Sequence, residues 1–218
     1  MKQYRYLDLL TSLSVTSVLI SDVTAPRMIS IAGMPVSVTV LYFPCAYLLG
    51  DILTEVYGYA AARRVAWHCL VASMIAGCLY QGVLLIPTID TVGRQEAFGQ
   101  VLGAVPRTLI GGWLALWSGM VINHSIMDRM KTWTEGRHLW LRAMMSTLIG
   151  EFVNTSFFYL IALSGILTIT QLGRAILLAT ALKVTIEVAL LPLTYGVVAY
   201  LSEQEEVDEL PRIPVFGG

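Results

Sequence analysis

The sequence predicts an all-α fold: a polytopic membrane protein whose core is a bundle of six transmembrane helices. Of the 218 residues, 56% are hydrophobic and 13% are charged, and the mean hydropathy is +0.69. Soluble domains carry about 25% charged residues, and a single soluble core could not bury this much apolar surface. Six apolar runs approach the roughly 20 residues that a helix needs to cross the hydrocarbon layer of a bilayer.

The apolar runs are separated by residues that end helices. Pro26, Gly33 and Pro35 follow the first run, and Gly58 follows the second. We therefore expect six spans with the approximate limits Leu7 to Ala25, Val36 to Tyr57, Val65 to Ile86, Val105 to Met127, Leu139 to Leu163 and Leu172 to Leu201. The break between the third and fourth spans fits a short interfacial helix around Phe98.

Charge predicts the domain limits and the orientation. Residues 1–202 are expected to form one transmembrane domain, and residues 203–218, which begin with an acidic run, a disordered C-terminal tail. Basic residues are more numerous on one side of the expected bundle, with Lys2, Arg5, Arg63, Arg64, Arg129, Lys131 and Arg137 against Arg27, Arg94, Arg107 and Arg174. Because Lys and Arg collect on the cytoplasmic side of membrane proteins, both termini are predicted to be cytoplasmic.

Several classes of function are excluded by composition and motif. The formal net charge of -1 argues against a nucleic-acid partner. Cys45, Cys69 and Cys78 lack the Cys-x-x-Cys spacing of metal and redox sites and are expected to be small buried packing residues. The sequence has no hydrolase elbow, metalloprotease motif or phosphate-binding loop, so we expect neither an enzyme nor a cofactor.

Ionisable residues inside the expected second span are candidate ligand-binding groups. A charged side chain at bilayer depth costs about 2.5 to 3.5 kcal/mol on insertion scales, so each one needs a partner or a role. Asp51 and Glu55 lie four residues apart in the string DILTEVYG, which places both carboxylates on one helix face. The alternative is that they lie at the cytoplasmic end of the span, where Arg63 or Arg64 reaches them.

The expected fifth and sixth spans carry further polar residues at helical spacing. Glu151, Asn154 and Phe158 follow one another at spacings of three and four residues and so form a stripe on one face. Lys183 and Glu187 lie four residues apart in the sixth span. They either pair with each other within the helix, or Lys183 neutralises Glu151, or an acid of the second span, across the bundle.

These segments resemble one known family. The segments that carry the resemblance are Phe43 and Pro44 ahead of DILTEVYG at 51 to 58, Arg63 with Arg64, the loop from Phe98 to Arg107, LWLRAMMSTLIGE at 139 to 151, and Lys183 and Glu187 ahead of Pro192, Tyr195 and Gly196. Together they resemble the queuosine precursor transporters of the vitamin uptake transporter group, which are six-helix proteins of the bacterial inner membrane. The resemblance covers most of residues 7 to 200. It implies import of 7-cyano-7-deazaguanine, with 7-aminomethyl-7-deazaguanine as a second candidate, for the queuosine modification of tRNA.

The candidate residues suit the guanine-like base that the resemblance implies. Such a base presents an N–H and an exocyclic amine side by side, which one carboxylate accepts as a bidentate pair, and its flat ring packs on an aromatic or apolar wall. The carboxylate candidates are Glu151, Asp51 and Glu187, with Glu55 beside them; Asn154 and Lys183 can address the carbonyl edge, and Phe43, Tyr47 and Phe158 can supply the wall.

Three functions remain open from the sequence. The first is a stand-alone secondary transporter in the lipid bilayer, driven by metabolic trapping or by protons, and a homodimer is compatible with it. The second is the substrate-binding subunit of an energy-coupling-factor uptake system. Such subunits often have an Ala-rich first helix, whereas the small residues of Leu7 to Ala25 are Ser and Thr until Ala25. The third is a structural membrane protein without a ligand, which would leave the charges within its spans unexplained.

Overall fold

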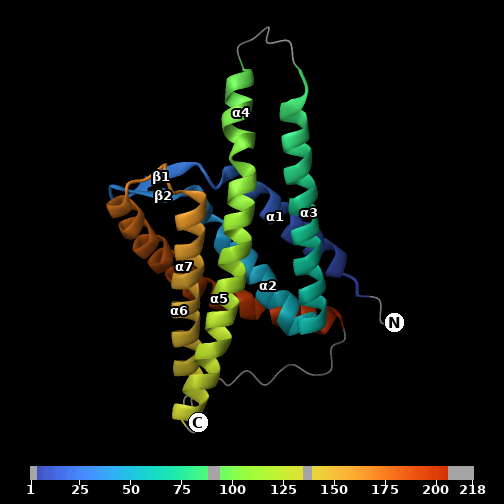
Figure 1. Cartoon of the computed structure of the whole chain (residues 1–218). Coiled ribbons are helices and arrows are strands. Elements are labelled where there is room, and N and C mark those ends of the chain that lie inside the picture. Colours follow the sequence, from blue (N-terminus) through green and yellow to red (C-terminus); the bar gives the residue numbers. More distant parts are fainter. Residues whose placement is uncertain (1–3, 88–93, 135–138, 206–218) are drawn as a thin grey trace.

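The computed structural model describes residues 4–87, 94–134 and 139–205, and these are predominantly helical (Figure 1). The elements are α1 (Leu7–Thr24), β1 (Met28–Ile31), β2 (Met34–Ser37), a 3-10 turn (Val38–Leu41), α2 (Phe43–Tyr57), α3 (Tyr59–Leu85), α4 (Gln95–Gly103), α5 (Val105–Trp133), α6 (Leu139–Ala162) and α7 (Ile169–Gln204). Among the described residues, three segments are long and apolar enough to cross a membrane, namely Leu7–Thr24, Ala60–Leu85 and Ile169–Gln204. The helical class is thus confirmed, and the bundle of six spans stays a prediction.

Most of the expected spans coincide with a helix, with shifted limits. α3 begins at Tyr59 rather than Val65, and α5 continues to Trp133 rather than ending at Met127. The short helix expected around Phe98 is α4. It pairs with the end of α3 and leads into α5, which makes the tall pair of rods in Figure 1.

The expected second span is wrong at its start, because the chain from Met28 to Ser37 forms a β-hairpin. β1 and β2 pair antiparallel through a two-residue turn of Ala32 and Gly33, both with positive φ. A turn of this kind matches the twist of paired strands and is typical of two-residue hairpins. Val36 therefore lies in a strand, and α2 begins only at Phe43. At 15 residues, α2 is shorter than the roughly 20 residues of a typical span.

α5 and α6 form the most closely packed helix pair, side by side in Figure 1. Glycine permits this approach. A Cβ atom on Gly119 of α5 would lie 3.0 Å from the Cβ of Asn154 and 3.2 Å from the carbonyl oxygen of Gly150, both on α6. Small residues at such a crossing let two backbones come together in an apolar environment, where dispersion replaces the hydrophobic effect as the driving force.

Two apolar cores flank the middle of α7. One contains the residues of the hairpin, α6 and the first half of α7, including Val36, Tyr159 and Ala179. The other joins α1, α2 and α3 to the last turns of α7, where Val198 and Leu201 lie. α7 crosses behind α6 toward the foot of α3 and so connects the two cores (Figure 1).

The cysteines do not all occupy core positions. Cys78 is exposed and Cys69 is half-buried, both on α3, so the expectation of buried packing residues is wrong for these two. α3 faces outward along much of its length, as its exposed Trp67, Met74 and Leu79 also show. The side chain of Cys45 lies outside the described residues.

Candidate functional site

The centre of the candidate site is a buried ion pair between α6 and α7. The Nζ atom of Lys183 lies 3.6 Å from the Oε2 atom of Glu151. Both residues are more than nine-tenths buried, at 7% and 8% exposed. Lys183 also donates a hydrogen bond of 3.2 Å to the hydroxyl of Thr155, which is fully buried on α6. Of the alternatives that the sequence left open for Lys183, the described residues show the ion pair with Glu151 across the bundle.

One further carboxylate, Glu187, lies within electrostatic range of this pair, and Asp51 lies within range of Glu187. Glu187, one turn after Lys183 on α7, interacts with Glu151, with Lys183 and with Asp51 of α2. Glu187 is half-buried and Asp51 is exposed, so the three acids run from the surface to the interior. Two carboxylates, those of Glu151 and Glu187, therefore interact with the ammonium group of Lys183. The structure brings these four predicted residues together from three helices.

Two buried polar atoms, one of them in the ion pair itself, have no hydrogen bond among the described residues. Among the described residues, Glu151 Oε2 and the hydroxyl of Thr180 are buried side-chain atoms that have no hydrogen-bond partner. Thr180 precedes Lys183 by three residues on α7 and so lies on the same helix face. Asn154 lies one turn from Glu151, is 6% exposed, and packs against Gly119 of α5. Buried polar groups are ordinarily satisfied, so open ones next to a charge pair fit a place where a ligand binds.

The other predicted residues differ in how they relate to this cluster. Phe158 is half-buried and packs edge-on against Tyr159, with ring centroids 6.1 Å apart. Glu55 is exposed and lies within electrostatic range of Asp51, and no ion pair in the described part of the chain joins it to Arg63 or Arg64. The side chains of Phe43 and Tyr47 lie outside the described residues. The predicted aromatic wall therefore remains a prediction.

Another carboxylate inside an expected span, the half-buried Asp22 on α1, was missed in the sequence. Its Oδ2 atom accepts a hydrogen bond of 2.6 Å from the hydroxyl of Ser73 on α3, and its backbone carbonyl accepts one of 2.9 Å from Thr108 on α5. Ser73 and Thr108 are both 1% exposed. The signal was available, because Asp22 is an acid within the first expected span and falls under the same argument as Asp51.

A buried carboxylate at the end of α7, Glu205, links this helix to the residues before α1 and to α2. It accepts hydrogen bonds from the backbone N–H groups of Arg5 and Tyr6, at 3.0 and 2.8 Å, and from the hydroxyl of Tyr57, at 2.9 Å. Glu205 directly follows α7, and residues 203–205 belong to the folded part of the chain rather than to a disordered tail. Residues 206–218 lie outside the described residues.

Other features of the structure lie away from this site. An apolar hollow between α3 and α4 is lined by Val83, Leu84, Ile86, Gln95, Phe98 and Gly99 and contains none of the clustered charges. Arg107 at the start of α5 donates hydrogen bonds to the carbonyl oxygens of Ile161 and Ser164, at the end of α6. A cation at the C-terminal end of a helix satisfies carbonyls that lack helical partners and complements the helix dipole, so Arg107 has a structural role there.

Three long apolar helices among the described residues, with a buried ion pair on one of them, are the features of a multi-pass membrane protein. The family model described as "Putative vitamin uptake transporter" matches residues 37–197. The chain belongs to this family, which consists of transporters and not of enzymes, and the resemblance noted in the sequence is thereby confirmed.

Two curated relatives carry more specific names. The "Probable queuosine precursor transporter" of Bacillus subtilis (strain 168) is 25% identical over 141 residues, which are 64% of this chain and 62% of the relative. The "Queuosine precursor transporter" of Escherichia coli (strain K12) is 23% identical over 160 residues, which are 72% of this chain and 67% of the relative. The match thus spans less than two thirds of the Bacillus protein. No solved structure matches this chain.

Proposed function

We propose that this protein imports queuosine precursors across the bacterial inner membrane, with 7-cyano-7-deazaguanine and 7-aminomethyl-7-deazaguanine as substrates. The observation that carries the proposal is the buried ion pair of Glu151 and Lys183 with Asp51 and Glu187 beside it. The names of the two relatives point to the same class of substrate. A structural membrane protein without a ligand would have little use for four charges between three helices.

The chemistry of the site matches a guanine-like base. The Oε2 atom of Glu151, which is paired with Lys183 but has no hydrogen bond, and the second carboxylate oxygen can accept the N–H and exocyclic amine of the base as two charge-assisted hydrogen bonds. Asn154 and Thr180 can address the remaining polar edge, and Phe158 can form part of the apolar wall. In this scheme Lys183 balances the charge of Glu151 before a base binds. Once the base is bound, Lys183 donates a hydrogen bond to its carbonyl oxygen.

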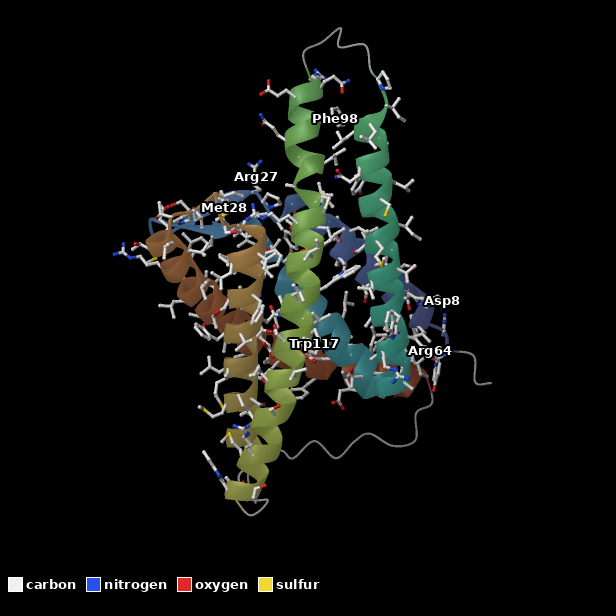
Figure 2. All side chains as sticks on the ribbon, in the orientation of Figure 1. Asp8, Arg27, Met28, Arg64, Phe98 and Trp117 are labelled. Atoms are coloured by element: carbon white, nitrogen blue, oxygen red, sulfur yellow. The ribbon has the colours of Figure 1, made fainter. Side chains whose placement is uncertain are left out.

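We propose a topology of six spans with both termini in the cytoplasm. α2, with the 3-10 turn before it, would be the second span. Arg64 and Asp8 lie toward the end of the molecule opposite to Arg27 and Phe98, in keeping with the two basic groups in the sequence (Figure 2). A reporter fused after residue 218 should be active only in its cytoplasmic form. Activity only as a periplasmic reporter would contradict the orientation.

Uptake in cells tests the function directly. A bacterial strain that lacks its own precursor synthesis and its own importer should form queuosine-modified tRNA from low external 7-cyano-7-deazaguanine only when it expresses this protein. Glu151→Gln should abolish the rescue, whereas Glu203→Gln, an exposed acid near the end of the same bundle, should preserve it. Equal tRNA modification with and without the protein would contradict the proposal.

A further inference from the structure

Asp22 is an acid on the apolar helix α1 that the proposed substrate site does not use. Its Oδ2 atom accepts a hydrogen bond of 2.6 Å from the hydroxyl of Ser73 on α3. No ion pair in the described part of the chain joins Asp22 to a cation. In this it differs from Glu151, which is paired with Lys183, and from Glu205, which accepts three hydrogen bonds. A carboxylate that lacks a cation in apolar surroundings is most simply neutralised by a proton.

The hydrogen-bond partner of Asp22 suits a group that gains and loses a proton. A hydroxyl donates to a carboxylate and accepts from a carboxylic acid, whereas a cation or a backbone N–H favours the ionised form alone. Ser73 is 1% exposed, so its hydroxyl is held in the interior. The hydroxyl of Thr108 on α5 donates a hydrogen bond of 2.9 Å to the backbone carbonyl of Asp22 and not to its carboxylate. This contact holds α1 without the carboxylate, whose protonation can therefore change while α1 stays in place.

The elements that pack against α1 bring few titratable groups to Asp22. These elements are α2, α3, α5 and the 3-10 turn, and the turn carries no titratable side chain. On α3, the thiol of Cys69 lies within electrostatic range of Asp22. On α5, the guanidinium of Arg107 is bound to carbonyl oxygens at the end of α6. On α2, the carboxylates of Asp51 and Glu55 act on each other. Among the described groups, the neighbours of Asp22 are thus hydroxyls and a thiol, and none of them fixes its charge.

Asp22 lies near the end of the bundle that the proposed topology places toward the periplasm. It is half-buried in the last turn of α1, which ends at Thr24. Arg27 follows shortly after and lies at the end of the molecule opposite to Asp8 and Arg64 (Figure 2). Protons from the periplasm therefore have access to Asp22.

Helix α5 connects Asp22 to the candidate substrate site. Its Thr108 contacts the backbone of Asp22. Roughly three turns later on the same face lies Gly119, where a Cβ atom would be 3.0 Å from the Cβ of Asn154 on α6. Asn154 lies one turn from Glu151. A movement of α1 at Asp22 would therefore act on the helix that packs most closely against the candidate site.

We propose that Asp22 binds the proton that drives import, one proton being taken from the periplasm and released to the cytoplasm for each base transported. This inference rests on the proposed function and adds its energy source. The proton adds to a carboxylate oxygen of Asp22, and the neutral acid keeps its hydrogen bond with Ser73. α1 changes its position in the bilayer only with Asp22 neutral, because movement of the ionised group would carry a charge into apolar surroundings. The movement of the proton is thereby tied to that of the base.

Uptake into liposomes that contain the purified full-length protein tests this coupling. With the acidic side outside, the wild type should accumulate 7-cyano-7-deazaguanine up to about tenfold per pH unit, the limit for one proton per base. Asp22→Asn keeps the size of the side chain and is neutral at every pH, so it should bring the base only to equal concentrations on the two sides. Its affinity for the base should stay within about threefold of the wild type, because Asp22 lies outside the substrate site. The matched control is Asp8→Asn, which removes an exposed acid of the same helix and should accumulate the base as the wild type does.

A second measurement needs no variant. Dicyclohexylcarbodiimide modifies carboxyl groups in apolar surroundings when they are protonated. Mass spectrometry of the wild type should therefore find Asp22 modified at acidic pH and protected as the pH is raised.

The outcomes separate the inference from the proposed function. Equilibration of the base by the wild type without accumulation, accumulation driven by a sodium gradient instead, or equal accumulation by Asp22→Asn overturns the inference and leaves the proposed function in place. Neither binding nor transport of the base by the wild type overturns both. If Asp22→Asn does not fold, the labelling decides, and modification of Asp22 that is absent or independent of pH overturns the inference.

Discussion

The backbone N–H of Tyr6 donates a hydrogen bond of 2.8 Å to the carboxylate of Glu205, which is 199 residues away in sequence. The same carboxylate holds the N–H of Arg5 and the hydroxyl of Tyr57, so one side chain fastens the beginning of α1 and the end of α2 to the end of α7. A negatively charged group next to the N-terminus of α1 also interacts favourably with the dipole of this helix. Glu205 thus closes one end of the bundle.

Removal of this carboxylate should destabilise the protein. Glu205→Ala leaves three donors without their acceptor in a buried place, and we expect a loss of about 1 to 3 kcal/mol in the free energy of unfolding. Thermal unfolding in detergent measures the loss. Glu203→Ala, at an exposed position two residues earlier, should change stability by less than about 0.5 kcal/mol. Equal stability of the two variants would show that the Glu205 contacts contribute nothing.

Removal of one partner of the ion pair in the candidate site should destabilise the protein, and removal of the second should restore part of the loss. Lys183→Met removes the cation and leaves Glu151 buried with its charge, which typically costs about 3 to 5 kcal/mol. Addition of Glu151→Gln removes that charge, so the double variant should regain most of the loss. Arg174→Met, at an exposed position on the same helix, is the control and should be close to neutral. A double variant as unstable as Lys183→Met would contradict the coupling.

Glu151→Gln alone tests ligand binding. The amide keeps the size of the side chain and replaces one acceptor by a donor, which opposes the N–H or amine of a guanine-like base. Affinity should fall about tenfold to a hundredfold while the protein remains folded. Unchanged affinity in a folded variant would remove Glu151 from the binding site, and Asp51 or Glu187 would then be the carboxylate to examine.

The close crossing of α5 and α6 makes a prediction with an internal control. Gly119→Ala places a methyl group 3.0 Å from the Cβ of Asn154 and should destabilise the protein by about 1 to 3 kcal/mol. Gly112→Ala on the same helix meets no atom of the described residues within 4 Å, and it should be neutral or stabilising, because Ala is the better helix former. Unfolding of both variants in the same detergent gives the comparison. A Gly119→Ala protein as stable as Gly112→Ala would show that the crossing has room to spare.

The sequence predicted the helices well because each long apolar run has one physical solution in lipid, a helix that satisfies its own backbone. The hairpin was missed because an apolar stretch rich in Ile, Met and Val fits a strand as well as a helix. The turn residues Ala32 and Gly33 then decide for the strand pair. A helix over Val36 to Leu41 would also have cost the buried hydrogen bond from the N–H of Ser37 to the hydroxyl of Tyr159.

The structure brings Lys183, Glu187 and Glu151 close to one another, and their role in ligand binding stays a prediction; the sequence left the partner of Lys183 open. Spacing along one helix places Lys183 next to Glu187, but the choice of Glu151 as its partner depends on how α6 packs against α7. The buried contacts of Glu205 could not be predicted from the sequence for the same reason. An acid in a charged run is ordinarily solvated, and its burial here depends on donors from the opposite end of the chain.

Asp22 supplies the last prediction, because it is the acid that no substrate argument uses. Its carboxylate is held by Ser73, at 2.6 Å, a short distance typical of a charge-assisted hydrogen bond. Ser73→Ala removes that donor from a buried position and should lower the free energy of unfolding by about 1 to 3 kcal/mol. Asp22→Asn retains an acceptor for the hydroxyl, so it should be better tolerated than Asp22→Leu, which leaves the hydroxyl of Ser73 without a partner.

The matched control is Ser12→Ala. Ser12 is an exposed serine of α1 whose hydroxyl donates a hydrogen bond to the carbonyl of Asp8, and its removal should cost less than about 0.5 kcal/mol. If Ser73→Ala and Ser12→Ala unfold at the same temperature in detergent, the contact does not fasten α1 to α3, and Asp22 must owe its place in the bilayer to another role.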